Sequence, residues 1–305
     1  MRFLFIGLGS IATKHIEDVC DIAKKQNIDI EIDILRRKIS DLPVKIASFV
    51  SRQITELDDT MYDSIFITNP TVLHYETLCK VKDKGKFYFI EKPIFNVTNV
   101  NLKSIGISEE NSYVAAPMRH TKVYKELKTI VNSHKIFSAR IICSSYLPEW
   151  RPNSDYRQIY SAIRALGGGV TLDLIHEIDY MVGLFGFPEE IYNLRGKYSN
   201  LEIDSDDLSI YIAKYKTLLC EVHLDYFGKK YRRTCEIFTE VGTFIADFGA
   251  ESITCPDGTK ISCLESERDI YSEMRYYLNF ISGKEKNLNP PELGVKVLKY
   301  SLGEI

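Results

Sequence analysis

A glycine-rich segment near the start of the chain could bind phosphate. Gly7 and Gly9 follow a short apolar run at residues 2–6, and Ala12 completes the spacing G-x-G-x-x-A where a helical pattern begins. The first glycine permits a tight turn, the second lets the backbone approach a pyrophosphate, and Ala12 lets the helix pack close to the strand. The N–H groups of the first helical turn can then donate to phosphate oxygens. The pattern therefore favours a dinucleotide site over a purely structural turn.

The end of the second expected strand, residues 28–35, bears on which dinucleotide would bind. An NAD site usually has a carboxylate here for the ribose hydroxyls. In this chain Asp33 lies inside the strand, and Arg36 and Arg37 follow it. Two guanidinium groups suit the 2'-phosphate of NADP, so NADP is slightly favoured over NAD. An exposed pair of surface arginines is an alternative of nearly equal weight.

Two more strand ends carry residues that could act on a ligand. Thr68, Asn69 and Pro70 end one strand, and Glu91-Lys92-Pro93 follows the next. Ligands of open α/β sheets collect at the carboxyl edge of the strands. An ammonium group at Lys92 could bind substrate oxygens there and assist proton transfer at a carbinol. The alternatives are an ordinary turn and a solvated lysine.

A third group of residues lies on a predicted helix in the second half of the chain. Gly167, Gly168 and Gly169 open a helical pattern over residues 169–184 that contains Asp173 and His176. Residues at this spacing share a helix face, so the carboxylate could orient the imidazole of a general acid/base. The commoner alternative is a histidine satisfied within the packing. One helix supplies too few ligands for a metal, and no metal site is predicted.

The segment before these glycines is rich in aromatic and charged side chains. Aromatic faces pack on sugar rings, and arginine and aspartate side chains hydrogen-bond sugar hydroxyls. The composition favours a polyhydroxylated ligand over the alternative, a latch of hydrogen-bonded tyrosines between domains. The residues concerned are Tyr146, Trp150, Arg151, Asp155, Tyr156, Arg157 and Tyr160.

The elements that must position these residues change in kind near Pro117. Before it, expected strands alternate with helices, which predicts a doubly wound parallel sheet. After it, segments of alternating hydrophobicity follow one another with turn signals between them, as in an antiparallel meander. The expected strands are 2–6, 28–35, 62–68, 86–90 and 112–116, then 136–146, 191–198, 208–215, 218–226, 234–239 and 243–248. The expected helices run to about residue 25 and over 72–84, 123–131, 169–184, 268–281 and 291–301.

The predicted fold class is therefore α/β, with an N-terminal doubly wound domain over residues 1–117. A C-terminal α+β domain over residues 118–305 carries one large open, mostly antiparallel sheet, and its last helix could pack back on the first domain. The 305 residues carry 39 Lys and Arg against 42 Asp and Glu, a net charge of -3, which excludes a polyanion-binding module. No apolar run is long enough to span a bilayer. Seven cysteines without C-x-x-C spacing indicate reduced thiols in a cytoplasm, with a Cys255–Cys263 pair as a minor alternative.

The motifs together resemble those of one enzyme family. Gly7-x-Gly9-x-x-Ala12, Glu91-Lys92-Pro93 and the segment 167–179, in this order and at these separations, resemble the Gfo/Idh/MocA oxidoreductases, named for glucose-fructose oxidoreductase and inositol dehydrogenase. The resemblance extends over nearly the whole chain and includes 68–70, 118–119, 146–161 and 223–226. The last two segments are similar to a branch found with surface-polysaccharide and nonulosonic-acid sugar pathways.

This resemblance implies a Rossmann domain and NAD(P)-dependent oxidation or reduction of a sugar or cyclitol carbon. Lys92 would be the active-site lysine and His176 the acid/base, with Asp173 beside them, although many members place this aspartate one residue earlier. The expected cofactor-binding residues are Gly7, Gly9, Ser10, Ile11, Ala12, Arg36, Arg37, Thr68, Asn69, Pro70, His74, Glu91 and Lys92. The expected substrate-binding residues are Arg119, Tyr146, Trp150, Arg151, Asp155, Tyr156, Arg157 and Tyr160.

The resemblance also implies a homodimer or homotetramer formed through the C-terminal sheet, with a small sugar as substrate and neither nucleic acid nor membrane as partner. Two other functions share this fold. One is a non-catalytic protein that senses the dinucleotide, although such relatives are expected to lose the lysine or the histidine. The other is an enzyme that makes or breaks a bond through a transient keto intermediate.

Overall fold

The computed structural model describes residues 1–304, which form two compact units. The first unit contains residues 1–117 and 267–296. The second contains residues 118–266 and the described residues from Val297 onward. Helix α7 (Asp269–Ile281), near the end of the chain, thus belongs to the same unit as the first 117 residues.

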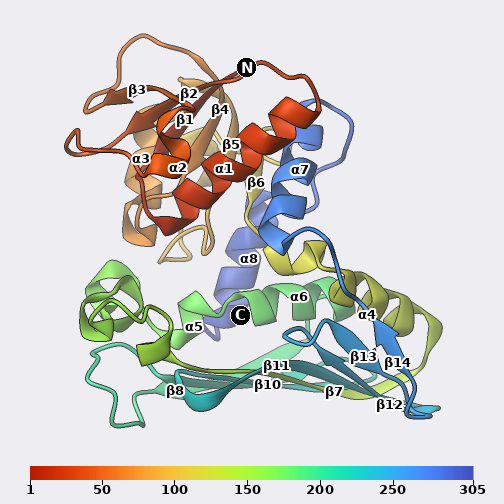
Figure 1. The fold of residues 1–305 in the computed structure, drawn as a ribbon. Helices are drawn as coiled ribbons and strands as arrows, with labels where there is room; N and C mark the ends of the chain where they lie inside the picture. The colour runs from red at the N-terminus through yellow and green to blue at the C-terminus, as the bar shows by residue number, and fades with distance from the viewer. Residues whose placement is uncertain (305) are drawn as a thin grey trace. The chain divides into compact units, whose positions relative to one another are not determined.

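The first unit is a parallel sheet of six strands in the order β3-β2-β1-β4-β5-β6 (Figure 1). Its strands are β1 (Arg2–Ile6), β2 (Glu31–Leu35), β3 (Val50–Ile54), β4 (Tyr62–Ile67), β5 (Gly85–Ile90) and β6 (Ser112–Val114). Its helices are α1 (Ser10–Lys25), α2 (Val44–Ala47), α3 (His74–Val81) and α7 (Asp269–Ile281), with 3-10 turns at Thr71–Leu73 and Leu102–Ile105. Because β1 lies in the middle of the order and adjoins both β2 and β4, the sheet is wound outward in both directions from it.

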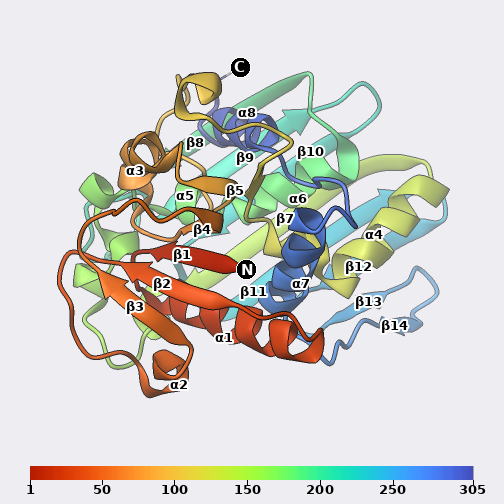
Figure 2. The ribbon, with the colours of Figure 1, turned by 90° about the horizontal axis from the view of Figure 1, so that it is seen from above.

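Helices α1 and α7 lie side by side and share one core with this sheet (Figure 2). On α1 the buried residues recur at helical spacing, as at Ala12, Ile16 and Val19. From α7 the Tyr277 ring contacts Phe66 and Phe89, at centroid distances of 5.5 and 5.1 Å. The late helix is therefore part of the hydrophobic core of the first unit.

The second unit has one sheet of eight strands in the order β14-β13-β12-β11-β7-β10-β9-β8, with α4, α5 and α6 over one face (Figure 1). Its strands are β7 (Ile136–Tyr146), β8 (Glu190–Gly196), β9 (Leu208–Lys214), β10 (Leu219–Asp225), β11 (Phe227–Thr239), β12 (Gly242–Asp247), β13 (Ser252–Thr254) and β14 (Lys260–Ser262). Its helices are α4 (Lys122–Ser133), α5 (Val170–Asp173) and α6 (His176–Phe185), with 3-10 turns at Pro117–His120, Leu147–Glu149, Tyr156–Gln158, Tyr160–Ala162 and Arg164–Leu166. The last helix, α8 (Pro291–Ser301), contains residues of both units.

The predicted fold class is confirmed, with three differences in detail. The second sheet is not a simple meander, because β7 lies between β10 and β11 and pairs with β10 in parallel. The helix expected over residues 169–184 is two helices, since the chain turns at Leu174 and Ile175. The short strands β3, β13 and β14 were not expected, because segments of 3 to 5 residues carry too little periodicity.

Two predictions from the sequence, on membrane-spanning segments and on disulfides, concern the chain as a whole. Across the described residues 1–304, none of the helices has both the length and the apolar character needed to cross a membrane. All seven cysteines are free thiols, so Cys255 and Cys263 do not form the disulfide considered from sequence. Most of them are buried, while Cys79 is exposed.

Candidate functional site at the edge of the parallel sheet

The loop between β1 and α1 has the conformation that a close phosphate approach requires. Gly7 has φ of 88°, and a Cβ there would lie 3.0 Å from the Cα of Asn69. A Cβ at Gly9 would meet nothing within 4 Å, so the backbone is open at that point. Gly9 also serves as the N-cap of α1 and provides no capping side chain. The first N–H groups of α1 therefore have no side-chain cap and can donate to an anion.

The loop after β4 is fastened to the glycine loop and to the loop after β5. The Thr68 hydroxyl lies 3.0 Å from the Ile6 carbonyl oxygen and 3.1 Å from that of Gly7. The His74 ring is buried, with Nε2 at 2.9 Å from the Asn69 carbonyl oxygen and Nδ1 at 3.0 Å from that of Ile94. Burial lowers the pKa of His74, and the two carbonyl acceptors oppose that shift. The His74 ring thus lies between the two loops, and in its neutral form one of its nitrogens donates to a carbonyl oxygen.

Glu91, directly after β5, contacts both helix α1 and the backbone of the next residue. Its Oε1 lies 2.6 Å from Nε2 of His15 on α1, and its Oε2 accepts the backbone N–H of Lys92 at 3.3 Å. Burial opposes ionisation, but the His15 hydrogen bond and the charge of Lys92 hold the pKa of Glu91 below its usual range. The Lys92–Pro93 peptide that follows is cis. The turn that carries Lys92 is therefore tied to α1.

The end of β2 carries one buried carboxylate, which forms ion pairs, and two arginines follow the strand. Asp33 is fully buried and accepts hydrogen bonds from Arg52, Arg2 and the Tyr62 hydroxyl. Its carboxylate is thus committed within the protein. Arg36 donates to Gln53 Oε1 at 3.1 Å, and Arg37 is exposed. The end of this strand therefore offers guanidinium groups, rather than a carboxylate, to a ligand.

In the second unit, Asp173 and His176 lie on either side of the break between α5 and α6. Asp173 ends α5 and accepts a hydrogen bond from the Tyr226 hydroxyl at 2.7 Å, while His176 is the first residue of α6. Asp206 holds the start of α5, because its Oδ2 accepts from the Thr171 N–H at 3.0 Å and from the hydroxyl at 2.6 Å. The three glycines before α5 are buried. The packing of this segment thus fixes the backbone that carries both residues.

Two buried ion pairs fasten α6 immediately after His176. Glu177, fully buried, contacts Arg233 of β11 at 2.5 Å. Asp179 binds Arg119 in a fork, with Nε to Oδ2 at 2.8 Å and Nη2 to Oδ1 at 2.9 Å. Arg119 was expected to contact a substrate. In the structure its guanidinium also donates to the Asp179 carbonyl at 3.0 Å, so its hydrogen bonds anchor the helix.

The tyrosine-rich loop uses many of its polar groups within the second unit. Trp150 donates from Nε1 to the Ser145 hydroxyl at 3.1 Å, and its ring meets Tyr226 edge-on at 5.2 Å. Arg157 is paired with Asp155 at 2.9 Å. The Tyr160 hydroxyl donates to the Gly167 carbonyl, the Tyr156 hydroxyl accepts from the Glu202 N–H, Arg151 is exposed and Tyr146 is half-buried. These contacts connect the loop to Tyr226 and to the glycines before α5.

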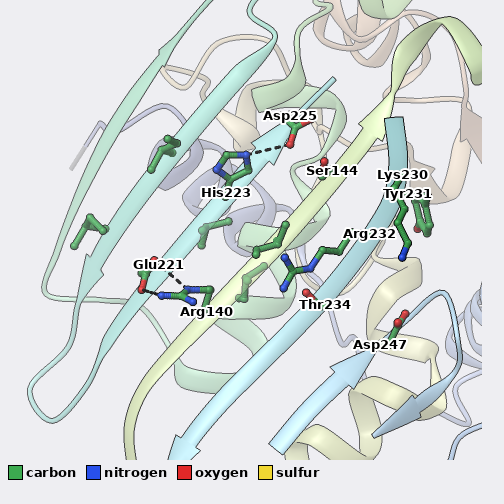
Figure 3. Close-up of a pocket in the computed structure, with 15 residues that line it drawn as sticks. Arg140, Ser144, Glu221, His223, Asp225, Lys230, Tyr231, Arg232, Thr234 and Asp247 are labelled. Carbon is green, nitrogen blue, oxygen red and sulfur yellow. Dashed lines mark hydrogen bonds and ion pairs between the residues drawn. The ribbon is translucent and has the colours of Figure 1, made fainter. Parts of the chain in front are cut away.

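A pocket of about 910 Å³ lies on the face of the large sheet opposite its helices (Figure 3). Charged residues line it, but they neutralise one another. Arg140 contacts Glu221 at 3.0 Å, and His223 Nε2 lies 3.0 Å from Asp225 Oδ2. Exposed apolar side chains also line it, such as Ile212 on β9, which lies opposite Glu221. The mixture does not favour a ligand of either charge.

Sequence reasoning missed two residues that shape the site. His15 lies within the apolar stripe of α1, where a buried imidazole needs a polar partner, and that misplaced polarity was the available signal. Tyr226 lies in a segment matched to the family, but nothing in its neighbours in sequence indicated the hydrogen bond to Asp173. That contact joins the end of β10 to a helix about fifty residues earlier in the chain.

Comparison with known families gives a match in the first unit. Residues 1–104 match the model of the oxidoreductase family with an NAD-binding Rossmann fold, GFO_IDH_MocA. The oxidoreductase YrbE of Bacillus subtilis is 25% identical over 188 residues, which are 58% of this chain and 52% of YrbE. The chain thus matches about half the length of this curated relative.

Solved structures share the fold over nearly the whole chain. A levoglucosan dehydrogenase, in complex with NADH and levoglucosan, matches with a TM-score of 0.80 at 15% identity, covering 99% of this chain and 95% of that one. The WlbA dehydrogenase of Bordetella pertussis, in complex with NADH and UDP-GlcNAcA, matches with a TM-score of 0.78 at 16% identity, covering 99% and 94%. At these identities the likeness concerns the fold.

Proposed function

Because residues 1–104 match the Gfo/Idh/MocA oxidoreductase family, we propose that the chain is an NAD(P)-dependent dehydrogenase or reductase of a sugar, sugar derivative or cyclitol. The observation that carries this proposal is the glycine loop, in which an open backbone at Gly9 leads directly into an uncapped α1. One similar structure is that of a levoglucosan dehydrogenase, and another is that of a dehydrogenase in complex with UDP-GlcNAcA. Both names support a sugar as substrate.

The first unit would bind the dinucleotide. The N–H groups of Ser10, Ile11 and Ala12 at the start of α1 suit its pyrophosphate. Arg36 and Arg37 suit a 2'-phosphate, and the commitment of Asp33 to Arg52 supports a preference for NADP over NAD. The bound dinucleotide would supply the hydride acceptor or donor, C4 of its nicotinamide.

Lys92 and His176 would assist proton transfer at the substrate hydroxyl. In the oxidation direction His176 would accept the hydroxyl proton of the carbinol, while the dinucleotide would supply the acceptor for the hydride that leaves the same carbon, so that a carbonyl remains. The Lys92 ammonium would bind the same oxygen and stabilise its developing negative charge. Asp173, held by Tyr226, would help to orient the imidazole. Reduction would use the same groups in reverse.

The test is turnover by the purified chain with a panel of sugars, cyclitols and nucleotide-sugars, followed by the absorbance of the reduced nicotinamide. We expect turnover with at least one of them, tighter binding of NADPH than of NADH, and a loss of kcat of about 10²-fold or more in Lys92→Ala and in His176→Ala, with NADPH binding retained in His176→Ala. Failure to bind either cofactor would refute the proposal. Cofactor binding without turnover of any panel member would favour the non-catalytic dinucleotide sensor.

We further propose that the chain forms a homodimer or homotetramer through the open face of the large sheet. Exposed apolar side chains on this face include Tyr192, Leu194, Ile212 and Ile245, with exposures of 62, 76, 43 and 41%. Between them lies a row of alternating charge, in which Arg140 contacts Glu221 on one side and Glu236 on the other. Such a row can pair with a rotated copy of itself, as a two-fold interface requires.

A further inference from the structure

The contact between His15 and Glu91 joins helix α1 to the turn that carries Lys92, and the proposed reaction uses both. His15 lies on α1, whose first turn would bind the pyrophosphate, and Glu91 precedes Lys92. The His15 side chain is 1% exposed and that of Glu91 is 12% exposed, so the 2.6 Å contact is shielded from water. Phe89 packs edge-on against the imidazole at 5.1 Å and restricts its rotation.

The proton on His15 can be assigned from its surroundings. Its Nδ1 is buried and has no hydrogen-bond partner among the described residues, whereas Nε2 faces the Glu91 carboxylate. A neutral imidazole therefore carries its proton on Nε2 and donates it to Glu91 Oε1. With Oε1 so held, Oε2 stays directed at the backbone N–H of Lys92. One side-chain contact thus fixes the backbone from which Lys92 extends.

We propose that His15 is a positioning residue, which acts through Glu91 to set the place of the Lys92 ammonium relative to the bound substrate oxygen. This inference rests on the proposed function of Lys92. His15 itself touches neither cofactor nor substrate in this scheme. Its removal should therefore lower kcat while leaving cofactor affinity nearly unchanged, because a small displacement of a catalytic group can cost about 10²-fold in rate.

The experiment compares two amides that differ in reach. In His15→Gln the amide nitrogen can take the place of Nε2 and donate to Glu91, whereas in His15→Asn the shorter amide corresponds to Nδ1 and cannot reach. We expect His15→Asn to lower kcat about 10²-fold, with the NADPH dissociation constant within about threefold, and His15→Gln to restore most of kcat. Glu91→Asp, which withdraws the carboxylate, should match His15→Asn, and the double variant should lose no more than either single variant.

A second measurement does not depend on turnover. Trace acetylation of Lys92 by acetic anhydride, followed across pH by peptide mass spectrometry, reports the ionisation and accessibility of its amine. We expect a displaced profile in His15→Asn and the wild-type profile in His15→Gln. Equal kcat and equal profiles in the two variants would overturn the proposal, and so would a loss of NADPH binding parallel to the loss of kcat. If no sugar is turned over, the proposed function fails, and the acetylation profiles still decide whether His15 positions Lys92. Should His15→Asn not fold, Glu91→Asp provides the same comparison against wild type.

Discussion

At the scale of single residues, buried ionisable groups gather near the carboxyl edge of the parallel sheet. Glu273 of α7 is 1% exposed, and its Oε1 accepts from the Tyr113 hydroxyl at 3.0 Å and from the Ala116 N–H at 2.5 Å. Burial, reinforced by the negative charge of Glu91, raises the pKa of Glu273 well above its usual value. The folded protein therefore holds the proton of Glu273 to a higher pH than the unfolded chain does.

This raised pKa predicts how Glu273→Gln should behave. The unfolded chain releases this proton near about pH 4.3 and the folded chain only at a higher pH, so above about pH 4.3 Glu273 makes the free energy of unfolding fall with rising pH by up to roughly 1.4 kcal/mol per pH unit. A glutamine keeps the acceptor oxygen but cannot ionise. We expect Glu273→Gln to remove this contribution, so that its urea midpoint relative to wild type increases as the pH rises above about 5.

The exposed Glu285→Gln provides the matched control, because it makes the same carboxyl-to-amide change at the solvent-accessible surface. Its effect on the urea midpoint should be small at every pH. If Glu273→Gln instead weakens the protein increasingly toward high pH, folding favours the ionised form of Glu273, and its pKa is not raised.

The sequence could identify residues whose role depends on local structure. It could not identify contacts that depend on packing between segments far apart in the chain. The conformation of Gly7 follows from the turn between β1 and α1, and sequence suffices to predict that turn. The pairing of His15 with Glu91 depends on the approach of a helix to a strand that lies far along the chain. The pairing of Arg119 with Asp179 of α6 likewise depends on packing, and its motif gave no indication of it.

At the scale of elements, α6 depends on ion pairs that lie beneath it. The Glu177 side chain is fully buried and that of Arg233 is 16% exposed, so removal of the carboxylate leaves a largely buried guanidinium without its partner. We expect Glu177→Ala to destabilise the second unit by about 3–5 kcal/mol, as measured by urea unfolding followed by circular dichroism. His176 begins this helix, so kcat should fall with it.

A matched control lies on the same sheet. Arg140 and Glu221 form an exposed pair, with side chains 44 and 52% exposed, and the pair is therefore screened by water. Glu221→Ala should cost no more than about 1 kcal/mol. Equal losses in Glu177→Ala and Glu221→Ala would show that the buried pair does not hold α6.

Element type could be predicted from sequence far better than element termination. The long strand β7 was predicted at its observed bounds, because its alternation is sustained over 11 residues. The break between α5 and α6 had no such signal, since Leu174 and Ile175 fit a continuous apolar helix. The chain turns there although both residues are buried, and tertiary contacts such as those of Asp173 with Tyr226 and of Glu177 with Arg233 hold the two helices.

At the scale of the whole molecule, the open face of the large sheet exposes several apolar side chains that a second copy of the chain could cover. A stable interface needs about 800 Å² from each partner, and a broad sheet face can provide such an area. We expect light scattering after size-exclusion chromatography to give the mass of two or four chains for the wild type. Each chain weighs 35.1 kDa.

A single charge in the middle of this face should separate the copies. Ile212→Asp on β9 would place a carboxylate in the apolar part of the interface, where its burial without a partner costs several kcal/mol. We expect this variant to run as a smaller species, most clearly at low protein concentration, while it still binds NADPH. Val44→Asp, at a residue 93% exposed in the first unit, is the control and should leave the mass unchanged. If Ile212→Asp keeps the wild-type mass, the copies associate through another surface, because an aspartate in a packed sheet interface would have to be expelled into water.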